Sequence, residues 1–298
     1  MDSRTLKQVV NLAESLHFGR ASEASHVSPS ALSRSIRRLE DDLGVILFER
    51  NNRRVRLTRA GEQFLRYARD ALGEWEAVRN RLMAESGELQ GEISMYCSVT
   101  ASHSFLFEIL ARFRQEHPRI EIKLHTGDPE DAISRVRSGS EDFAIGARPT
   151  ALPPGLAFRQ IAISPLVFIA ARDLFERDRG PGNVRDWASQ PMILPERGLA
   201  RERVDAWFRA LDLQSNIYAQ VAGNEAIVSM VSLGFGVGVV PQIVLENSPL
   251  AESVRMLDLK PALEPYEVGL FTRKHRLSSP IIRAFWSRLP NRDIDVQA

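Results

Sequence analysis

The sequence predicts an α-helical winged helix-turn-helix domain, then a long linker helix, then an α/β domain. Three observations predict this order. Short helical patterns and two strand-like segments fill the first 58 residues, a regular apolar spacing follows, and strands alternate with helices beyond Gly91. The 298 residues suffice for two domains, and a 44% hydrophobic content with 26% charge is typical of a globular protein with a core.

Composition excludes several classes of protein. The 39 basic and 38 acidic residues leave a net charge of +1, so any basic surface has to be local. The single cysteine, Cys97, excludes an internal disulfide and a multi-cysteine metal site. No uncharged apolar run reaches about 18 residues, and no apolar signal core follows Met1. We therefore expect a cytoplasmic protein without a membrane span.

The first three helices are short. Apolar residues at helical spacing predict a helix from Arg4 to Leu16, and a second one follows Phe18. Ser28 is a good N-cap for a third helix, and Pro29 suits the first helical position, where no N–H is needed. Gly44 lies just past its expected end.

The third helix has two faces. One is apolar and should be buried; it comprises Leu32, Ile36, Leu39 and Leu43. The other is polar and basic, and with Pro29 at the start it supplies the predicted DNA contacts Ser30, Ser33, Arg34, Arg37 and Arg38. Hydroxyls and guanidinium groups can contact phosphates and base edges in a major groove. The alternative is a three-helix bundle with a solvated basic face.

A wing follows the third helix. Residues 47–50 and 55–58 resemble two strands, and the tip between them carries Arg53 and Arg54, which can reach a minor groove or the DNA backbone. From Arg34 to Arg59 there are eight arginines and four acidic residues. This local excess of positive charge, in a nearly neutral chain, favours nucleic-acid binding.

The long helix after Thr58 should reach about Leu89. Its apolar positions repeat with a 4-3-4-3-4 spacing typical of a helix–helix interface: Phe64, Ala68, Ala71, Trp75, Val78 and Leu82. The alternative is an amphipathic helix that packs on its own domain. Next to a DNA-binding module, the spacing favours a dimer, which would present two recognition helices to an inverted-repeat site.

The remaining residues alternate between strands and helices. Strands at 92–99, 120–124 and 143–146 enclose helices at 102–117 and 129–137, an order that predicts a parallel, doubly wound sheet. Further strands are expected at 166–170, 217–221, 236–240 and 266–272, with helices at 201–210, 224–233 and 280–289. Ligands on such sheets bind outside the carboxyl ends of the strands.

Candidate ligand-binding residues lie at those strand ends and at helix starts. Free N–H groups and hydroxyls after the first strand offer a site for a small carboxylate, although a plain helix cap has the same residues. Cations and amides elsewhere could assist, or could be solvated or cap a helix. The set is Ser98, Thr100, Ala101, Ser102, Thr126, Arg148, Arg197 and Asn224.

Enzyme chemistry finds little support. Gly234–Gly238 has the composition of a dinucleotide loop, but a helix precedes it and a strand follows, which is the reverse of that motif. The six histidines show no metal-ligand pairing, and no nucleophile elbow is apparent. Cys97 is interpreted as a small buried residue rather than a nucleophile. We expect neither catalytic residues, nor a metal, nor a cofactor.

Several motifs together resemble the LysR-type transcriptional regulators. They are His17-Phe18-Gly19-Arg20-Ala21, Val27-Ser28-Pro29-Ser30-Ala31-Leu32-Ser33-Arg34, Leu39-Glu40-Asp41-Asp42-Leu43-Gly44 and Thr58-Arg59-Ala60-Gly61. The resemblance extends over the whole chain. It implies a DNA-binding domain at 1–58, a linker helix at 59–90, and an effector-binding domain at 91–298 like the periplasmic binding proteins.

The resemblance also implies two lobes, with the effector between them. Lobe I would hold 91–162 and 266–298, lobe II would hold 163–265, and crossover strands would lie near 161–165 and 265–269. It implies a tetramer built as a dimer of dimers, and contact with RNA polymerase.

Other stretches, such as 97–101, 113–118, 121–128, 225–231 and 244–249, are similar to members of this family that activate the gene for acetohydroxy acid isomeroreductase. That similarity implies 2-acetolactate or 2-aceto-2-hydroxybutyrate as the effector. Two alternatives stay open: a regulator of another pathway with a different small anionic effector, and a solute-binding protein. The arginine-rich segment 171–182 matches nothing in the family pattern.

Overall fold

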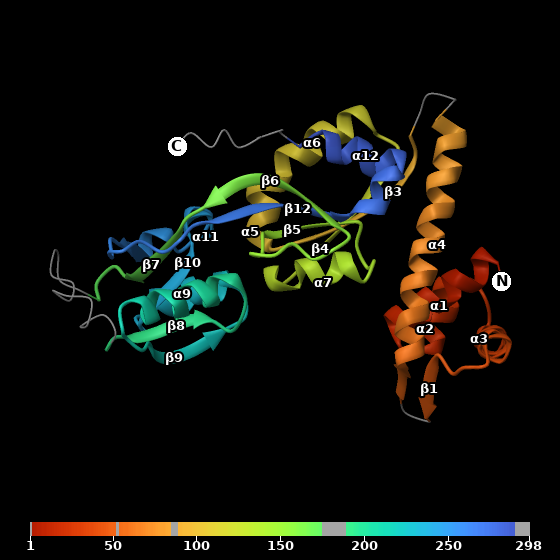
Figure 1. Cartoon of the computed structure of the whole chain (residues 1–298), viewed down its shortest axis with the longest axis horizontal. Helices are drawn as coiled ribbons and strands as arrows, with labels where there is room; N and C mark the ends of the chain where they lie inside the picture. Colours follow the sequence, from red (N-terminus) through yellow and green to blue (C-terminus); the bar gives the residue numbers. More distant parts are fainter. Residues whose placement is uncertain (1, 52–53, 85–88, 175–188, 290–298) are drawn as a thin grey trace.

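The computed structural model describes residues 2–51, 54–84, 89–174 and 189–289. A helical module with a small β-hairpin lies at one end of the molecule, and a long helix leads from it to two α/β lobes (Figure 1). This arrangement confirms the predicted fold class. No described helix is long and apolar enough to cross a membrane.

The amino-terminal module is a winged helix-turn-helix. It contains α1 (Ser3–Ser15), α2 (Phe18–Ala24), α3 (Pro29–Leu43) and a hairpin of β1 (Phe48–Asn51) and β2 (Arg54–Leu57). The two strands are antiparallel, with Phe48 opposite Leu57. Val9, Leu12, Leu32, Ile36 and Phe48 are almost wholly buried in one small core.

Helix α3 begins where the sequence predicts. Ser28 is the N-cap, its Oγ accepts a hydrogen bond from the Ala31 N–H at 3.2 Å, and Gly44 ends the helix with φ +69°. The prediction that Leu43 is buried is wrong, because its side chain is 43% exposed. Leu39 is the last α3 residue in the core of the module, and the final turn of the helix extends past it.

Helix α4 (Arg59–Ala84) connects this module to the first lobe. Near its middle it contacts both bodies. Arg69 pairs with Glu14 of α1 at 3.1 Å and donates to the Ser138 carbonyl oxygen of lobe I at 3.2 Å, and Asp70 forms an ion pair with Arg273 of lobe I. Gly73 lies against the Arg276 guanidinium, where a Cβ would overlap it. Lobe I is therefore held directly on the linker helix.

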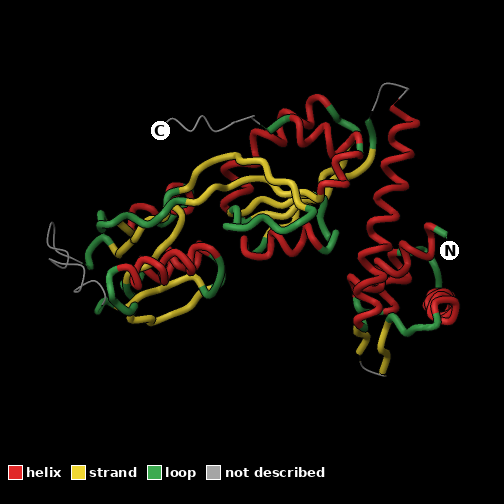
Figure 2. Tube along the Cα trace, viewed as in Figure 1, coloured by secondary structure: helices red, strands yellow, loops and turns green. Residues whose placement is uncertain are grey.

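Lobe I is a five-stranded sheet with helices on both sides (Figure 2). Its strand order is β4-β3-β5-β12-β6, where these are Ile120–Thr126, Gly91–Cys97, Phe143–Ala147, Tyr266–Arg273 and Leu156–Ser164. The helical segments are α5 (Val99–Ala101), the π-helical η1 (Ser102–Leu106), α6 (Phe107–Glu116), η2 (Pro129–Asp131), α7 (Ala132–Arg137), η4 (Lys274–Ser278) and α12 (Pro280–Ser287).

The sheet of lobe I combines the three strands predicted to be parallel with two strands that connect to the other lobe. Strands β3, β4 and β5 are parallel, but β12 runs antiparallel to both β5 and β6. The reason is topological, since β6 carries the chain toward the other lobe and β12 brings it back. Tyr266 pairs with Ser164 where these two strands leave the sheet.

Lobe II repeats the architecture with a second five-stranded sheet, in the order β11-β7-β10-β8-β9. These strands are Val254–Leu257, Leu166–Ala171, Val237–Pro241, Pro191–Pro195 and Asn216–Val221. The helical segments are α9 (Leu199–Ala210), α10 (Asn224–Ser232), α11 (Gln242–Glu246) and η3 (Ala251–Ser253). Strands β8 and β11 were not predicted. Part of the segment 171–182 lies outside the described residues.

Candidate functional site

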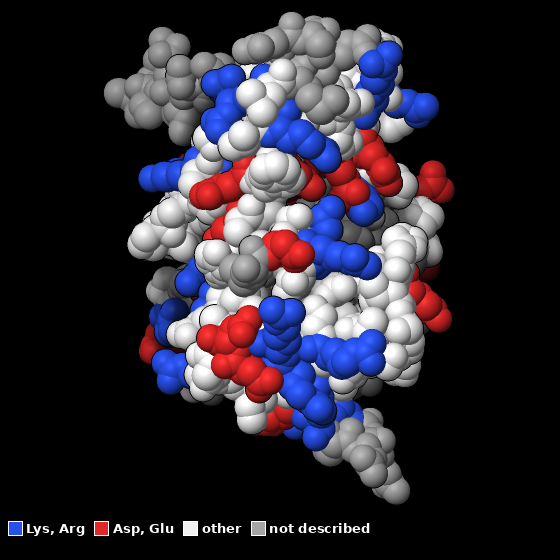
Figure 3. All heavy atoms as spheres, turned by 90° about the vertical axis from the view of Figure 1, so that its right-hand side faces the viewer, with Lys and Arg blue, Asp and Glu red and all other residues white. Residues whose placement is uncertain are grey.

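The outer face of α3 is basic and open. Arg34, Arg37, Arg38 and Ser30 are exposed, and Ser33 is half-buried. In the described part of the chain, none of the three arginines forms an ion pair. On the side of the molecule where α3 lies, lysines and arginines gather beside a smaller acidic patch (Figure 3). Guanidinium groups without an acidic partner are available to phosphates and base edges.

Glu40 fixes the wing to the recognition helix. Its Oε1 accepts hydrogen bonds from the N–H groups of Leu47 and Phe48, at 2.9 and 3.0 Å, and its Oε2 pairs with Arg50. From sequence, Glu40 counted only as an acid that reduces the local positive charge. Of the wing arginines, Arg54 is exposed on β2, and Arg53 lies outside the described residues.

The apolar stripe of α4 has two halves. Toward the winged module, Phe64 packs against the core of that module, Ala68 is fully buried and Ala71 is half-buried. Beyond them Trp75 is 59% exposed, Leu82 is 69% exposed, and Val78 is exposed as well. The first half therefore packs on its own chain, as the alternative interpretation has it, while the second half is uncovered.

A cavity of about 390 Å³ lies between the two lobes. Five of the eight predicted ligand-binding residues line it: Ser98, Thr100, Ala101, Arg197 and Asn224. They come from the loop after β3 and from the starts of α9 and α10. Asn224 is not the cap of α10; that position belongs to Gly223, with φ +89°, and Asn224 is the first helical residue.

The other three predicted residues do not line the cavity. Ser102 donates its hydroxyl to the Val99 carbonyl oxygen at 2.6 Å, and Thr126 is exposed at the end of the edge strand β4. Arg148 pairs with Glu267 at 2.8 Å and covers the ring of Phe158. The positions of the strand ends therefore predicted the edge of the sheet at which the cavity lies, but not which side chains point into the cavity.

The first turn after β3 presents hydrogen-bond donors to the cavity. Ser98 caps this turn, because its Oγ accepts from the Ala101 N–H at 3.1 Å. Thr100 is 6% exposed, and both its N–H and its Oγ1 donate to Oε1 of Glu225, at 3.2 and 2.6 Å. Glu225 belongs to the first turn of α10 in lobe II, so this contact bridges the cleft.

A second carboxylate crosses the cleft in the opposite direction. Glu130 of lobe I lies against Gly198, where φ is +91° and a Cβ would overlap the carboxylate. Burial raises the pKa of Glu130 to about 7, the charges of Asp128 and Glu202 add to this, and Arg197 and the Leu199 N–H oppose it. Each lobe therefore places an acidic side chain at a helix start of the other.

Arg197 is the cation of the cavity, and it is already paired. It contacts Asp128 at 3.0 Å and Asp131 at 3.1 Å, both from lobe I. The acidic partners of Arg197 follow strand β4 directly. The sequence predicts Arg197 as a ligand-binding cation, but the carboxylates that balance its charge were not predicted.

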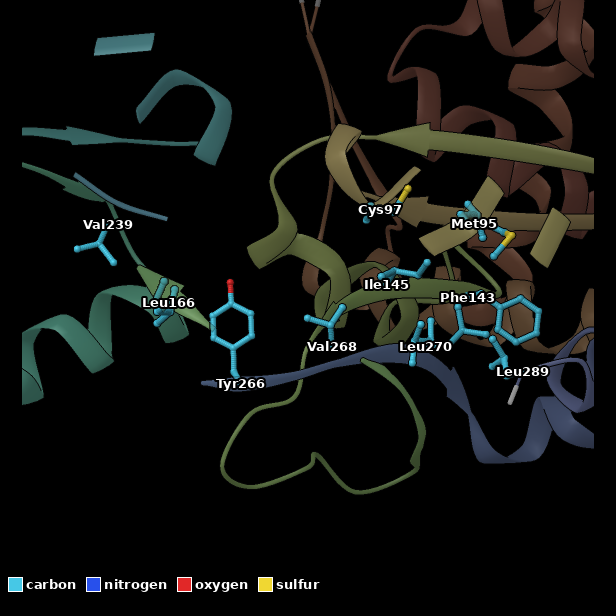
Figure 4. Packing of buried hydrophobic residues seen from close by; sticks show 14 of the residues in the cluster. Met95, Cys97, Phe143, Ile145, Leu166, Val239, Tyr266, Val268, Leu270 and Leu289 are labelled. Atoms are coloured by element: carbon cyan, nitrogen blue, oxygen red, sulfur yellow. The ribbon is translucent and has the colours of Figure 1, made fainter. Parts of the chain in front are cut away.

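Two further cavity residues were missed. Ser164 is 3% exposed, and within the described structure its Oγ has no hydrogen-bond partner. Tyr266, its partner across the crossover strands, is buried, and that burial raises the pKa of its phenol. In Figure 4 the Tyr266 ring stands between Leu166 and Val268, with its hydroxyl pointing away from β12. The one available signal was that both residues sit at the expected crossover points.

The core of lobe I, beneath the cavity residues, is apolar. Met95, Cys97, Ile145 and Leu270 are buried in one cluster (Figure 4). Burial raises the pKa of the Cys97 thiol to about 11, so it stays protonated at neutral pH. This fits the interpretation of Cys97 as a small buried residue. Among the described residues, no group of three His, Cys, Asp or Glu side chains could hold a metal ion.

Three features together define a class of protein: a basic helix with a wing, a long helix with an uncovered apolar half, and a polar cavity between two lobes. They are the parts of a DNA-binding regulator that responds to a small ligand.

Two family models match this chain. Residues 3–62 match the bacterial regulatory helix-turn-helix protein model of the lysR family, and residues 86–292 match the LysR substrate binding domain. The chain belongs to the LysR family and is a transcriptional regulator rather than an enzyme.

Curated relatives share the whole length of the chain. The transcriptional activator IlvY of Salmonella typhimurium is 45% identical over 98% of this chain and 100% of its own. The transcriptional regulator IlvY of Escherichia coli K12 is 45% identical over 98% and 99%. The crystal structure of full-length CbnR with its target DNA has a TM-score of 0.65 at 24% identity, over 97% of this chain and 99% of that one, which shows a common fold.

Proposed function

We propose that this protein activates expression of the acetohydroxy acid isomeroreductase gene, and that it does so in response to 2-acetolactate or 2-aceto-2-hydroxybutyrate. The identity of 45% with IlvY proteins, sustained over almost the full length of both chains, carries the proposal. The alternative is a LysR-type regulator of another pathway with a different small anion. A solute-binding protein is disfavoured by the helix-turn-helix match.

The proposed DNA interface is α3 together with the wing. Arg34 and Arg37 would read base edges, with Pro29, Ser30, Ser33 and Arg38 beside them on α3, and Arg53 and Arg54 would contact the backbone or minor groove. The uncovered half of the α4 stripe would pair two copies, so that two recognition helices face an inverted repeat.

The proposed effector site is the cavity between the lobes. The effector has one carboxylate, one tertiary hydroxyl and one ketone, and each needs hydrogen-bond partners. Thr100 supplies a hydroxyl and an N–H, and Ser164 supplies an unused hydroxyl. Asn224 adds an amide. A ligand of so few heavy atoms has little binding energy to gain, so we expect a Kd between micromolar and millimolar.

Two neighbouring strands of lobe I run from the cavity to the side of the lobe that contacts the linker helix. Strands β5 and β12 are paired side by side, and Ala147 and Val268 line the cavity at one end of them. Beyond the opposite ends, Asp142 pairs with Arg276 at 2.6 Å, and Arg273 pairs with Asp70 of α4. An effector that favours one lobe arrangement would change how α4 packs on lobe I. The size of this shift is limited by the difference in the effector's affinity for the two lobe arrangements.

The proposal is tested by calorimetric titration of freshly made 2-acetolactate into the purified full-length protein, with pyruvate and valine as controls. Saturable binding that the controls lack supports the effector. Protection of the isomeroreductase promoter in a footprint supports the target. Footprint protection without any binding at millimolar 2-acetolactate would keep the target and remove the effector.

A further inference from the structure

The carboxylate of Glu225 accepts the hydrogen bonds of Thr100, a residue of the cavity wall that a carboxylate ligand would need. Its Oε1 accepts both the N–H and the Oγ1 of Thr100, which are the donors that the loop after β3 turns into the cavity. Hydrogen bonds to a charged acceptor are the strong ones, so these donors are satisfied from within the chain. An effector carboxylate bound to Thr100 must compete with a carboxylate already there.

A second observation shows that the cavity has unused capacity for a ligand. Ser164 Oγ is buried in its wall and has no hydrogen-bond partner in the described structure. A buried hydroxyl without a partner costs free energy that a bound polar molecule would recover. Glu225 satisfies Thr100 but leaves Ser164 unsatisfied, whereas a small hydroxy acid has enough polar atoms to serve both.

Glu225 is free to leave. The residue as a whole is exposed at the first turn of α10, so a rotated side chain would be solvated. Its contact with Thr100 joins lobe II to lobe I, hence its departure removes one bridge across the cleft. The bridge made by Glu130 at the start of α9 does not depend on it.

From these contacts, and on the basis of the proposed function, we propose that Glu225 is an internal competitor for the effector. The effector carboxylate displaces the Glu225 side chain from Thr100, and the loss of that bridge is the structural signal of binding. The residue thus raises the affinity threshold for carboxylates and supplies one of the contacts that hold the lobes in their ligand-free arrangement.

The test compares Glu225→Ala with Glu252→Ala. Glu252 is an exposed acid on η3 of lobe II that does not line the cavity, so its loss removes the same charge without freeing Thr100. We expect Glu225→Ala to bind 2-acetolactate about tenfold more tightly than the parent, the effect of one charge-assisted hydrogen bond. Glu252→Ala should change the affinity by less than about twofold, because its charge acts through solvent.

A second measurement needs no particular effector. Without ligand, amide hydrogen exchange at 99–106 should be faster in Glu225→Ala than in the parent, and millimolar acetate should restore the protection in that variant alone. Unchanged hydrogen exchange in Glu225→Ala, or no restored protection with acetate, would contradict the proposal that Glu225 competes with the effector. If acetate restores the protection but neither the parent nor the variant binds 2-acetolactate, Glu225 still competes with carboxylates and the proposed effector is wrong.

Discussion

The DNA-binding module and the effector cleft are built in opposite ways. The module presents most of its proposed DNA contacts on one continuous helix, and three exposed arginines there face no acidic partner among the described residues. The cleft assembles side chains from four or more segments, and its charges are already compensated across the lobes, as with Arg197 on Asp128 and Asp131. The charges of the first site are unpaired before its partner binds, whereas those of the second are already paired within the protein.

The difference teaches what each site must do. A surface that docks on phosphates gains from charge that is uncompensated before binding. A cavity that switches must have two states of similar free energy, so its ligand-free form needs contacts that the ligand can replace. Cross-lobe carboxylates such as Glu130 and Glu225 provide such contacts.

The largest expected effect is on the assembly that aligns two modules. Replacing Trp75 and Leu82 with Glu places carboxylates on the uncovered half of the α4 stripe. If that half pairs two copies, the dimer should weaken by about 3 kcal/mol or more, since unpaired charges would be buried. Sedimentation equilibrium measures this. Arg81→Glu, an exposed α4 position off the stripe, is the control, and an unaltered dimer in the double variant would move the interface elsewhere.

The next effect tests the open site directly. Arg34→Ala should lose about 1–3 kcal/mol of affinity for the proposed target, the isomeroreductase promoter, which is the range of a bidentate contact to a base. Fluorescence anisotropy at fixed salt measures it, and Arg112→Ala, an exposed position on α6, serves as the control. Equal affinities for the parent and Arg34→Ala would show that α3 does not read the DNA through this residue.

The helix ends and the buried helix face of the module could be predicted because each depends on residues that are close together in the sequence. Ser28, Pro29 and Gly44 define the ends of α3, and helical periodicity alone identifies Ile36 as buried. Periodicity fails at Leu43 because burial there depends on where the neighbouring helices end, and that is a property of packing.

The cleft could be predicted only in part. The strand-end rule brought Ser98 and Thr100 to the correct edge of the sheet. It did not find Glu225, which lies 125 residues from Thr100 in the chain, because only the crossover topology places the two together. The same topology turned Arg148 away onto Glu267. Contacts between lobes are the part of the site that patterns in one segment do not encode.

A smaller effect concerns the donors of the cleft. In the Glu225→Ala background, where no carboxylate of the protein competes for Thr100, Thr100→Val keeps the buried volume but removes the hydroxyl, so affinity for 2-acetolactate should fall by about 1 kcal/mol. Ser102→Ala is the matched control, since that hydroxyl bonds to the Val99 carbonyl oxygen instead of lining the cavity. Titration calorimetry compares the two, and an equal loss in both variants would mean that the hydroxyls act only on the helix start.

The smallest effect separates the two regions by pH. Burial raises the pKa of Glu130 from 4.5 to about 7, so the folded protein holds this proton more tightly than the unfolded chain does. The stability that the protonated carboxyl contributes is therefore complete below about pH 4.5, and it is lost as the pH rises through 7. Glu130→Gln stays neutral throughout, and its amide oxygen can still accept from the Leu199 N–H.

The Tm of Glu130→Gln should accordingly match that of the parent at pH 5 and exceed it by about 2–4 °C at pH 8, after allowance for solvent screening. Thermal unfolding of the full-length protein at the two pH values measures this. The groups that face Glu130 are Asp128, Glu202 and Arg197. Glu252→Gln, at an exposed position of lobe II that is not among them, is the control for a general loss of charge. A Tm difference that is the same at both pH values would mean that Glu130 is ionised in the closed cleft, with Arg197 compensating its charge.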